Sequence, residues 1–222
     1  MPFERIIKPA DFSLPRINEN VILFFNLNHF FMFRDYCSPT KVKSYGPSKK
    51  YNFQHQEKSY TVIGGCIGAP LAAITLENAI ESGGKRFLTF GSAGWLSIDK
   101  PPTSIINSIS AIYDQTGISE DYGFESNILN LQNNVGYQIV STNSFYQLTK
   151  NKVKKYREQS IALIDMEIAP LVFITSLFKL TLKPVFIVSD LVDKDFNWKN
   201  LINTTEFSET LTSGFTHLIE ML

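Results

Sequence analysis

Short apolar runs recur along the chain and are separated by polar or glycine-containing segments. Most of the runs are continuous rather than alternating, which is typical of strands covered on both faces of a sheet. Segment 38–50, with two prolines, a glycine and four lysines, indicates loop and edge structure instead. The expected strands are Asn20–Phe25, Tyr51–Phe53, Ser59–Ile63, Lys85–Phe90, Asn107–Tyr113, Tyr137–Ser141, Ile161–Ile164 and Val185–Val188.

Helical patterns alternate with these strands. Pro70 suits the first turn of a helix, apolar residues follow it at helical spacing, and Gly83 comes after the last of them. Strand, loop, helix and strand between Ser59 and Phe90 form a βαβ unit, which implies parallel strands. Further helices are expected at Phe30–Tyr36, Tyr146–Tyr156, Glu167–Leu180 and Phe207–Met221. The pattern predicts a single α/β domain over residues 1–222, with a mixed central β-sheet flanked by helices.

Composition limits the kinds of partner. The 222 residues include 21 basic and 21 acidic side chains, so no global field attracts nucleic acid or an anionic membrane, and any anion site has to be local. No apolar run reaches the roughly 18 residues that a membrane helix needs. Cys37 and Cys66 are too few for a disulfide framework or for a zinc site alone. We therefore expect no metal and a reducing, cytoplasmic location.

Two glycine-rich segments present groups that can bind a ligand. The loop Gly64–Pro70 lies at a strand-to-helix turn, where backbone amides cradle an anion or a sugar, or where the chain simply turns tightly. Gly91–Gly94 follows a buried strand, the place where α/β sheets bind ligands. Ser92 there can donate a hydrogen bond to a phosphate or a water; an ordinary turn is the alternative.

Two further segments are acidic. Asp165 and Glu167 straddle the end of a strand and the start of a helix. A carboxylate there caps the helix or, alternatively, binds ribose hydroxyls and stabilises the positive charge that grows on a sugar as its glycosidic bond breaks. Asp190, after Ser189, either caps a turn or serves as a general acid, since a purine leaves easily only when its N7 is protonated.

Taken in order, these segments resemble the nucleoside phosphorylase family, which includes hexameric purine nucleoside phosphorylases, uridine phosphorylases and methylthioadenosine/adenosylhomocysteine nucleosidases. The stretch GGCIGAPLAAITLENAIESGGKRFLTFGSAGWL looks like that family's glycine loop, helix and central strand. STNSFY is similar to its base-pocket segment, ALIDMEIAPL to its ribose segment and FIVSDLVD to its Ser-Asp segment. The similarity runs from about Val21 onward and implies a three-layer fold that breaks a base–ribose bond.

The resemblance also implies roles for individual residues. Asp190 would be the acid for N7, which favours a purine base, and Glu167 would lie on the ribose hydroxyls. The base site would comprise Phe145, which stacks on the base, with Ser189 and Asp190. The ribose site would comprise Met166, Glu167 and Asp165, the last at a position that is usually Glu.

The site for the acceptor of the sugar departs from the family. Phosphorylases carry a Gly-Asp-Pro-x-Arg loop where this chain has Phe25–Phe30, and an arginine where it has Thr89. Losing two bidentate arginine contacts weakens phosphate binding. Nucleosidases place a glutamate after the first strand to activate water; His29 is the candidate base there, or it is structural. The phosphate or water site would then comprise Gly68, Ser92, Thr89 and His29.

Other cations leave alternatives open. Arg34 reaches the acceptor site or faces solvent, and Lys49 or Lys50 of a neighbouring subunit could replace a third arginine. Two functions follow: cleavage of a nucleoside, with a purine base favoured, by phosphorolysis or hydrolysis, or nucleoside binding by a divergent member without turnover. No cofactor is expected, with inorganic phosphate as a candidate co-substrate. The expected partners are a small-molecule nucleoside and further copies of the chain, in a homodimer or higher homo-oligomer.

Overall fold

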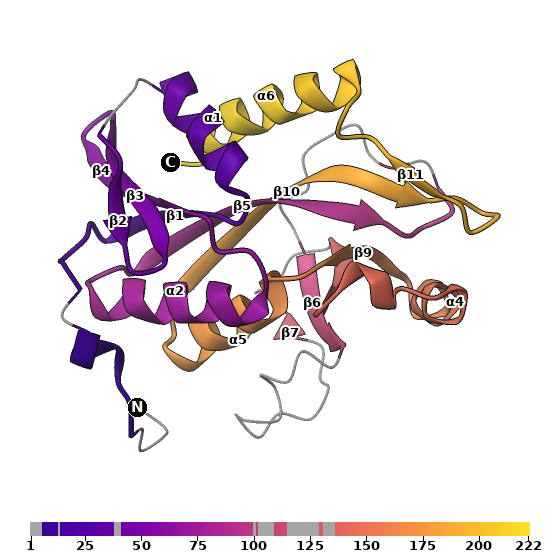
Figure 1. Ribbon diagram of the computed structural model, residues 1–222, viewed down its shortest axis with the longest axis horizontal. Coiled ribbons are helices and arrows are strands. Elements are labelled where there is room, and N and C mark those ends of the chain that lie inside the picture. Colours follow the sequence, from indigo (N-terminus) through magenta and orange to yellow (C-terminus); the bar gives the residue numbers. More distant parts are fainter. Residues whose placement is uncertain are drawn as a thin grey trace.

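The structure, a computed structural model, describes residues 6–12, 14–37, 41–99, 101, 109–114, 129–130 and 136–222. Within them, eleven strands form one mixed sheet in the order β2-β3-β4-β1-β5-β9-β8-β6-β7, with β10 on β5 and β11 on β10 (Figure 1). The strands are β1 (Asn20–Phe24), β2 (Lys43–Tyr45), β3 (Ser48–His55), β4 (Lys58–Gly64), β5 (Arg86–Trp95), β6 (Ile109–Asp114), β7 (Leu129–Asn130), β8 (Tyr137–Thr142), β9 (Ile161–Asp165), β10 (Thr181–Val192) and β11 (Trp198–Asn200). The helices are α1 (Leu27–Cys37), α2 (Ala69–Glu81), α4 (Lys150–Glu158), α5 (Ile168–Leu177) and α6 (Thr205–Glu220), with 3-10 turns η1 (Pro9–Phe12) and η2 (Phe145–Gln147).

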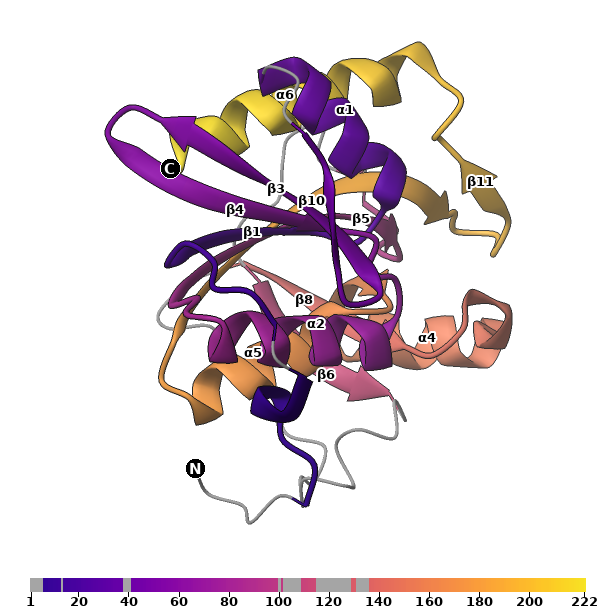
Figure 2. The same ribbon diagram turned by 60° about the vertical axis from the view of Figure 1, so that its left-hand side comes forward.

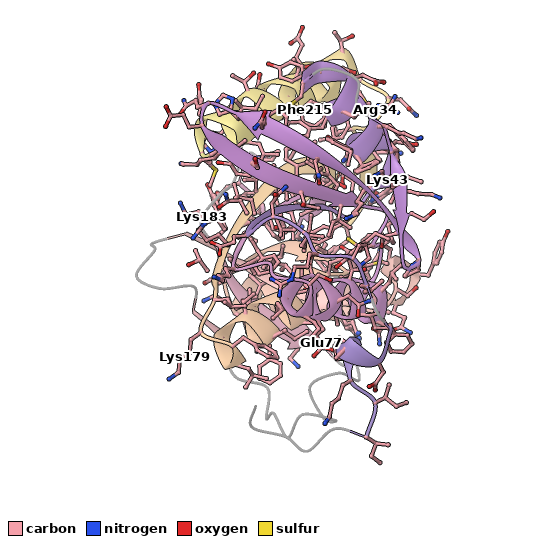
Figure 3. All side chains as sticks on the ribbon, turned by 90° about the vertical axis from the view of Figure 1, so that its left-hand side faces the viewer. Arg34, Lys43, Glu77, Lys179, Lys183 and Phe215 are labelled. Carbon is pink, nitrogen blue, oxygen red and sulfur yellow. The ribbon has the colours of Figure 1, made fainter. Side chains whose placement is uncertain are left out.

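Helices cover both faces of the sheet, which confirms the expected three layers. Helices α1 and α6 lie on one face, while α2 and α5 lie on the other (Figure 2). Because successive side chains of a strand point to opposite faces, Phe90 of β5 packs with Phe215 of α6, whereas Phe87 belongs to the cluster under α2 and α5. Phe215 and Glu77 of α2 mark the two helical layers in Figure 3.

The predicted βαβ unit is present, with one strand inserted. Strands β4 and β5 are parallel and joined through α2, but β1 lies between them and pairs with both. Pro70 occupies the first turn of α2, and Gly83 follows the helix with a φ of +113°, a conformation that glycine adopts without strain. The elements of this unit therefore follow from the sequence pattern, whereas the position of β1 between its two strands does not.

Several strands are longer than expected; β3, for example, runs over Ser48–His55 where Tyr51–Phe53 was expected. The prediction that the strand ends at Gly91–Gly94 is wrong: β5 continues to Trp95, because β10 pairs with it along its length. Likewise Ser189-Asp190 lies inside β10 and does not follow it. The expected helix at Tyr146–Tyr156 is divided into η2 and α4, and α5 ends at Leu177. Parts of the predicted segments, residues 38–40 and 107–108, lie outside the described residues.

Besides the short strands β2 and β7, strand β11 and the turn η1 were not predicted. Both consist largely of exposed side chains, so they carry no apolar periodicity from which they could be found. Within the described residues, none of the helices combines the length and the hydropathy needed to cross a membrane.

Candidate functional site

The C-terminal ends of β1, parallel to β5, and of β9, antiparallel to β5, face each other along one edge of β5. On one edge of β5, β1 pairs through Phe90, and the antiparallel β9 pairs from Gly94 onward. Between these two partners, among the described residues, segment 91–93 has no strand on that edge, whereas β10 pairs along the other edge. Strand ends and this unpaired edge of β5, which we call the opening, therefore meet at one place, which is where we locate the candidate site.

The glycine loop is bonded to the acidic segment at this opening. Gly68 donates its N–H to Glu167 Oε1 at 2.7 Å, and the N–H of Met166 donates to Glu167 Oε2 at 3.2 Å. Gly68 has a φ of +85°, which favours glycine. Glu167 is buried, and burial together with the nearby Asp165 carboxylate raises its pKa. Residues about a hundred positions apart therefore form one polar cluster.

Asp165 caps α5. Its side chain is only 1 % exposed, and it accepts hydrogen bonds from the hydroxyl of Ser141 at 2.5 Å and from the N–H of Ile168 at 2.8 Å. Ser141 in turn accepts a bond from Ala169 N at 2.9 Å. Burial raises the pKa of Asp165, although these hydrogen bonds act to lower it. The expectation that Asp165 contacts ribose is corrected: its carboxylate is turned into the protein and fixes the turn that carries Met166 and Glu167.

Asp190 lies on the far edge of the opening. The pairing of β10 with β5 shifts between Val188 and Asp190, and this bulge turns the partly exposed carboxylate over Gly94. Ser189 donates to Asp190 Oδ1 at 2.8 Å, and the indole N–H of Trp198 donates to Oδ2 at 3.1 Å. Sequence reasoning missed Trp198, because nothing in the isolated Trp-Lys-Asn segment indicated a strand.

The acceptor side of the opening, where the resemblance would place the phosphate or water that accepts the sugar, is apolar. A Cβ placed on Gly91 would lie 2.6 Å from the ring of Phe25 and 3.2 Å from the ring of Phe186, so two aromatic side chains cover this glycine. Thr89 is fully buried, and its hydroxyl has no hydrogen-bond partner in the described part of the chain. Ser92 is partly exposed and belongs to the opposite face of β5. The structure thus separates Ser92 from Thr89, which the sequence had grouped together.

Comparisons with known proteins agree on the fold. No family model and no curated protein matches the sequence. Solved structures do match over nearly the whole chain. A purine nucleoside phosphorylase from Toxoplasma gondii, in complex with immucillin-H, is 14 % identical, with 96 % of this chain and 92 % of that chain covered and a TM-score of 0.74. A uridine phosphorylase from Vibrio fischeri is 16 % identical, with 99 % of both chains covered and a TM-score of 0.75.

A mutant futalosine hydrolase from Helicobacter pylori is 17 % identical, with 93 % of this chain and all (100 %) of that chain covered and a TM-score of 0.69. This chain has the nucleoside phosphorylase fold. The fold confirms the three-layer architecture that the resemblance implied, while identities of 14–17 % leave the chemistry to be argued from this chain's own residues.

Within the nucleoside phosphorylase fold, His29 lies in an apolar layer. It is 7 % exposed, and its ring meets Phe90 at 6.0 Å and Phe207 at 6.4 Å between centroids. Burial lowers the His29 pKa to about 4, so the imidazole is neutral at neutral pH. His29 therefore offers no positive charge to a phosphate and is a weak base for water.

The other candidate cations have partners of their own. The Arg34 guanidinium donates to the neighbouring Asp35 carboxylate and lies 5.1 Å from the centre of the Phe31 ring. The Lys50 ammonium lies 5.3 Å from the centre of the Tyr45 ring. Neither contact directs a cation to segment 91–93, so these contacts leave the acceptor side without an assigned cation.

Phe145 follows β8, whose end lies beside the end of β9. It is 55 % exposed, so its ring is available to a ligand. A cavity of about 520 Å³ lies near the other end of β9, lined by residues that include Trp95, Tyr137 and Arg157. Because Arg157 and the Trp95 indole are bonded to backbone carbonyls of the protein, we place the site at the opening and not in this cavity.

Proposed function

We propose that this protein cleaves the N-glycosidic bond of a purine nucleoside and that water accepts the ribosyl group. One pair of observations carries the proposal: the buried Glu167 is bonded to Gly68, and the partly exposed Asp190 lies over Gly94, which pairs with Ile164 three residues before Glu167. The structural neighbours, two nucleoside phosphorylases of different base class and a hydrolase, support bond cleavage in general.

Glu167 suits the sugar side of the reaction. Breaking the glycosidic bond leaves positive charge on the ribose ring, and a buried carboxylate held in place stabilises that charge strongly. Burial and Asp165 raise the pKa of Glu167 in the unliganded protein. A positive charge developing on the ribose offsets the cost of burial and the repulsion by Asp165, and so favours the ionised form of Glu167. The attraction between Glu167 and the ribose is therefore stronger in the transition state than in the ground state.

Asp190 suits the base side. The departing purine carries extra electron density, which protonation at N7 relieves, and a carboxyl group within hydrogen-bond reach can deliver or hold that proton. Ser189 and Trp198 already fix the direction of both Asp190 oxygens. The partly exposed Phe145 at the end of β8 offers a face on which the base can stack.

Water is the acceptor that fits the apolar side of the opening. A phosphate dianion needs several charge-assisted donors, but here Phe25 and Phe186 cover Gly91, and Thr89 is buried. His29 is held neutral by burial, which lowers its pKa. A water molecule needs only a few neutral partners, so it is the acceptor that this environment tolerates.

A nucleoside panel tests the proposal. Purine and pyrimidine nucleosides are incubated with the protein, with and without inorganic phosphate, and free base, free ribose and ribose 1-phosphate are quantified. We expect purine release at the same rate in both conditions, with free ribose as the second product. Strict dependence on phosphate would refute the water assignment, and release of pyrimidines alone would refute the base assignment. A protein that binds nucleosides without cleaving any would be the binding protein considered from the sequence.

A further inference from the structure

The short strand β11 brings an aromatic donor to the carboxylate of Asp190. It pairs antiparallel with the end of β10, with Val192 opposite Trp198 and Asp190 opposite Asn200. Trp198 is therefore a diagonal neighbour of Asp190, a separation that an indole can span. Its N–H donates to Asp190 Oδ2 at 3.1 Å, while the side chain remains 63 % exposed.

The hairpin that carries Trp198 is held firmly at its base. Arg157 of α4 donates to the carbonyl of Leu96 at 2.6 Å and to those of Val192 and Asp193 at 2.7 and 2.9 Å. The Asp193 carboxylate accepts bonds from the turn amides of Asp195 and Asn197, each at 2.9 Å. Because the turn is bonded on both sides, the position of Trp198 is set by the fold and not by a free loop.

The carboxylate of Asp190 has little freedom left once Trp198 is in place. Oδ1 accepts from Ser189 at 2.8 Å, and Oδ2 lies between the Trp198 N–H and Gly94. Rotation of the carboxylate would break both bonds. The exposed indole ring lies beside the same carboxylate, where a flat base bound to Asp190 could pack against it.

We propose that Trp198 is a positioning residue of the base site: it fixes the Asp190 carboxylate through its N–H and shields a bound purine with its ring. This assignment rests on the proposed function, because it gives Trp198 a role through Asp190. It adds a residue from β11, a strand that no sequence motif marked.

Kinetics of Trp198→Phe test the positioning role. The variant keeps an aromatic ring but lacks the donor, so we expect kcat to fall roughly tenfold to a hundredfold with KM changed less than about threefold. In an Asp190→Asn background, the same change should lower kcat by less than about twofold, since the group it positions is gone. Lys199→Ala, on the same strand, is the matched control and should retain wild-type kcat.

An unchanged kcat in Trp198→Phe, or an equal loss in the Asp190→Asn background, would overturn the positioning role. The shielding role is tested by a second experiment that needs no turnover. Acrylamide quenching of tryptophan fluorescence is compared between wild type and Trp198→Phe, with and without excess hypoxanthine or adenine. The difference isolates Trp198, because the chain contains only two tryptophans. Bound base should protect Trp198 from quenching.

The two proposals fail separately. A wild type that cleaves no nucleoside refutes the proposed function, and the shielding role of Trp198 is then decided by quenching alone. A wild type that cleaves nucleosides while bound base leaves Trp198 fully accessible refutes the shielding role. Absence of both cleavage and protection overturns the two together.

Discussion

Replacing Gly94 with alanine tests whether Asp190 acts from the position seen in the structure. A Cβ at residue 94 would lie 2.8 Å from Asp190 Oδ2 and 2.9 Å from Ile164 Cγ2, whereas ordinary contacts begin near 3.4 Å. The carboxylate must therefore retreat by about 0.6 Å or rotate away from Ser189 and Trp198. Overpacking of this kind costs about 1–3 kcal/mol.

Two measurements follow from the Gly94→Ala displacement. The melting temperature, followed by circular dichroism, should fall by roughly 2–4 °C for each kcal/mol in a chain of this length. Nucleoside cleavage, followed by ultraviolet absorbance, should lose about tenfold to a hundredfold in kcat, since a misplacement near 1 Å costs about a hundredfold. The fall in melting temperature measures the crowding of the core, and only the fall in kcat measures the displacement of Asp190.

Gly214→Ala separates these two effects. A Cβ on Gly214 of α6 would lie 3.0 Å from two ring carbons of Phe90, so it crowds the core of the same sheet without touching Asp190. We expect a comparable or smaller loss of stability, because alanine also favours the helix by about 1 kcal/mol, and an unchanged kcat. If Gly94→Ala cleaves nucleosides as fast as Gly214→Ala, the assignment of Asp190 as the acid is wrong.

Two further changes address the rest of the site. Glu167→Gln removes a carboxyl group whose pKa is raised in the folded protein, so the wild type should lose stability relative to the variant as pH rises from about 5 to about 8. Urea unfolding across this range measures the difference in the free energy of unfolding. A difference that does not change with pH would contradict the argument that burial raises this pKa. Phe145→Ala should raise the Kd for a purine base about tenfold, by calorimetry, through lost stacking; an unaltered Kd means the ring is not part of the base site.

The cores of the strands could be predicted from the sequence, but their ends could not. Continuous apolar runs such as Val21–Phe24 and Val185–Val188 are short and rich in β-branched and aromatic residues, which favours buried strands, and both are buried strands. Gly91 and Gly94 were placed after the end of a strand, yet both lie inside β5. Their missing side chains make room for Phe25 and for Asp190, a reason that is visible only once distant segments are packed together.

The segments of the candidate site were identified by their order, while their orientation was not. Glu167 and Gly68 do meet, as expected of two site segments. Asp165, two residues from Glu167, points into the protein instead of toward the opening. Sequence alone could not decide between them, because both lie where a helix begins and either could have served as its cap.

The geometry of α5 explains why the two carboxylates differ. Asp165 accepts the N–H of Ile168 and of Glu167 at the positive end of the helix, and the Ser141 hydroxyl completes its coordination. Both of its oxygens thus have hydrogen-bond donors within the protein. Among the described residues, Glu167 accepts hydrogen bonds from two amides, and the nearby Asp165 carboxylate repels its charge, so Glu167 is the carboxylate left to be stabilised by an outside positive charge. In the proposed reaction the ribosyl cation supplies such a charge. Glu167 is therefore the carboxylate of the pair that we propose stabilises the transition state.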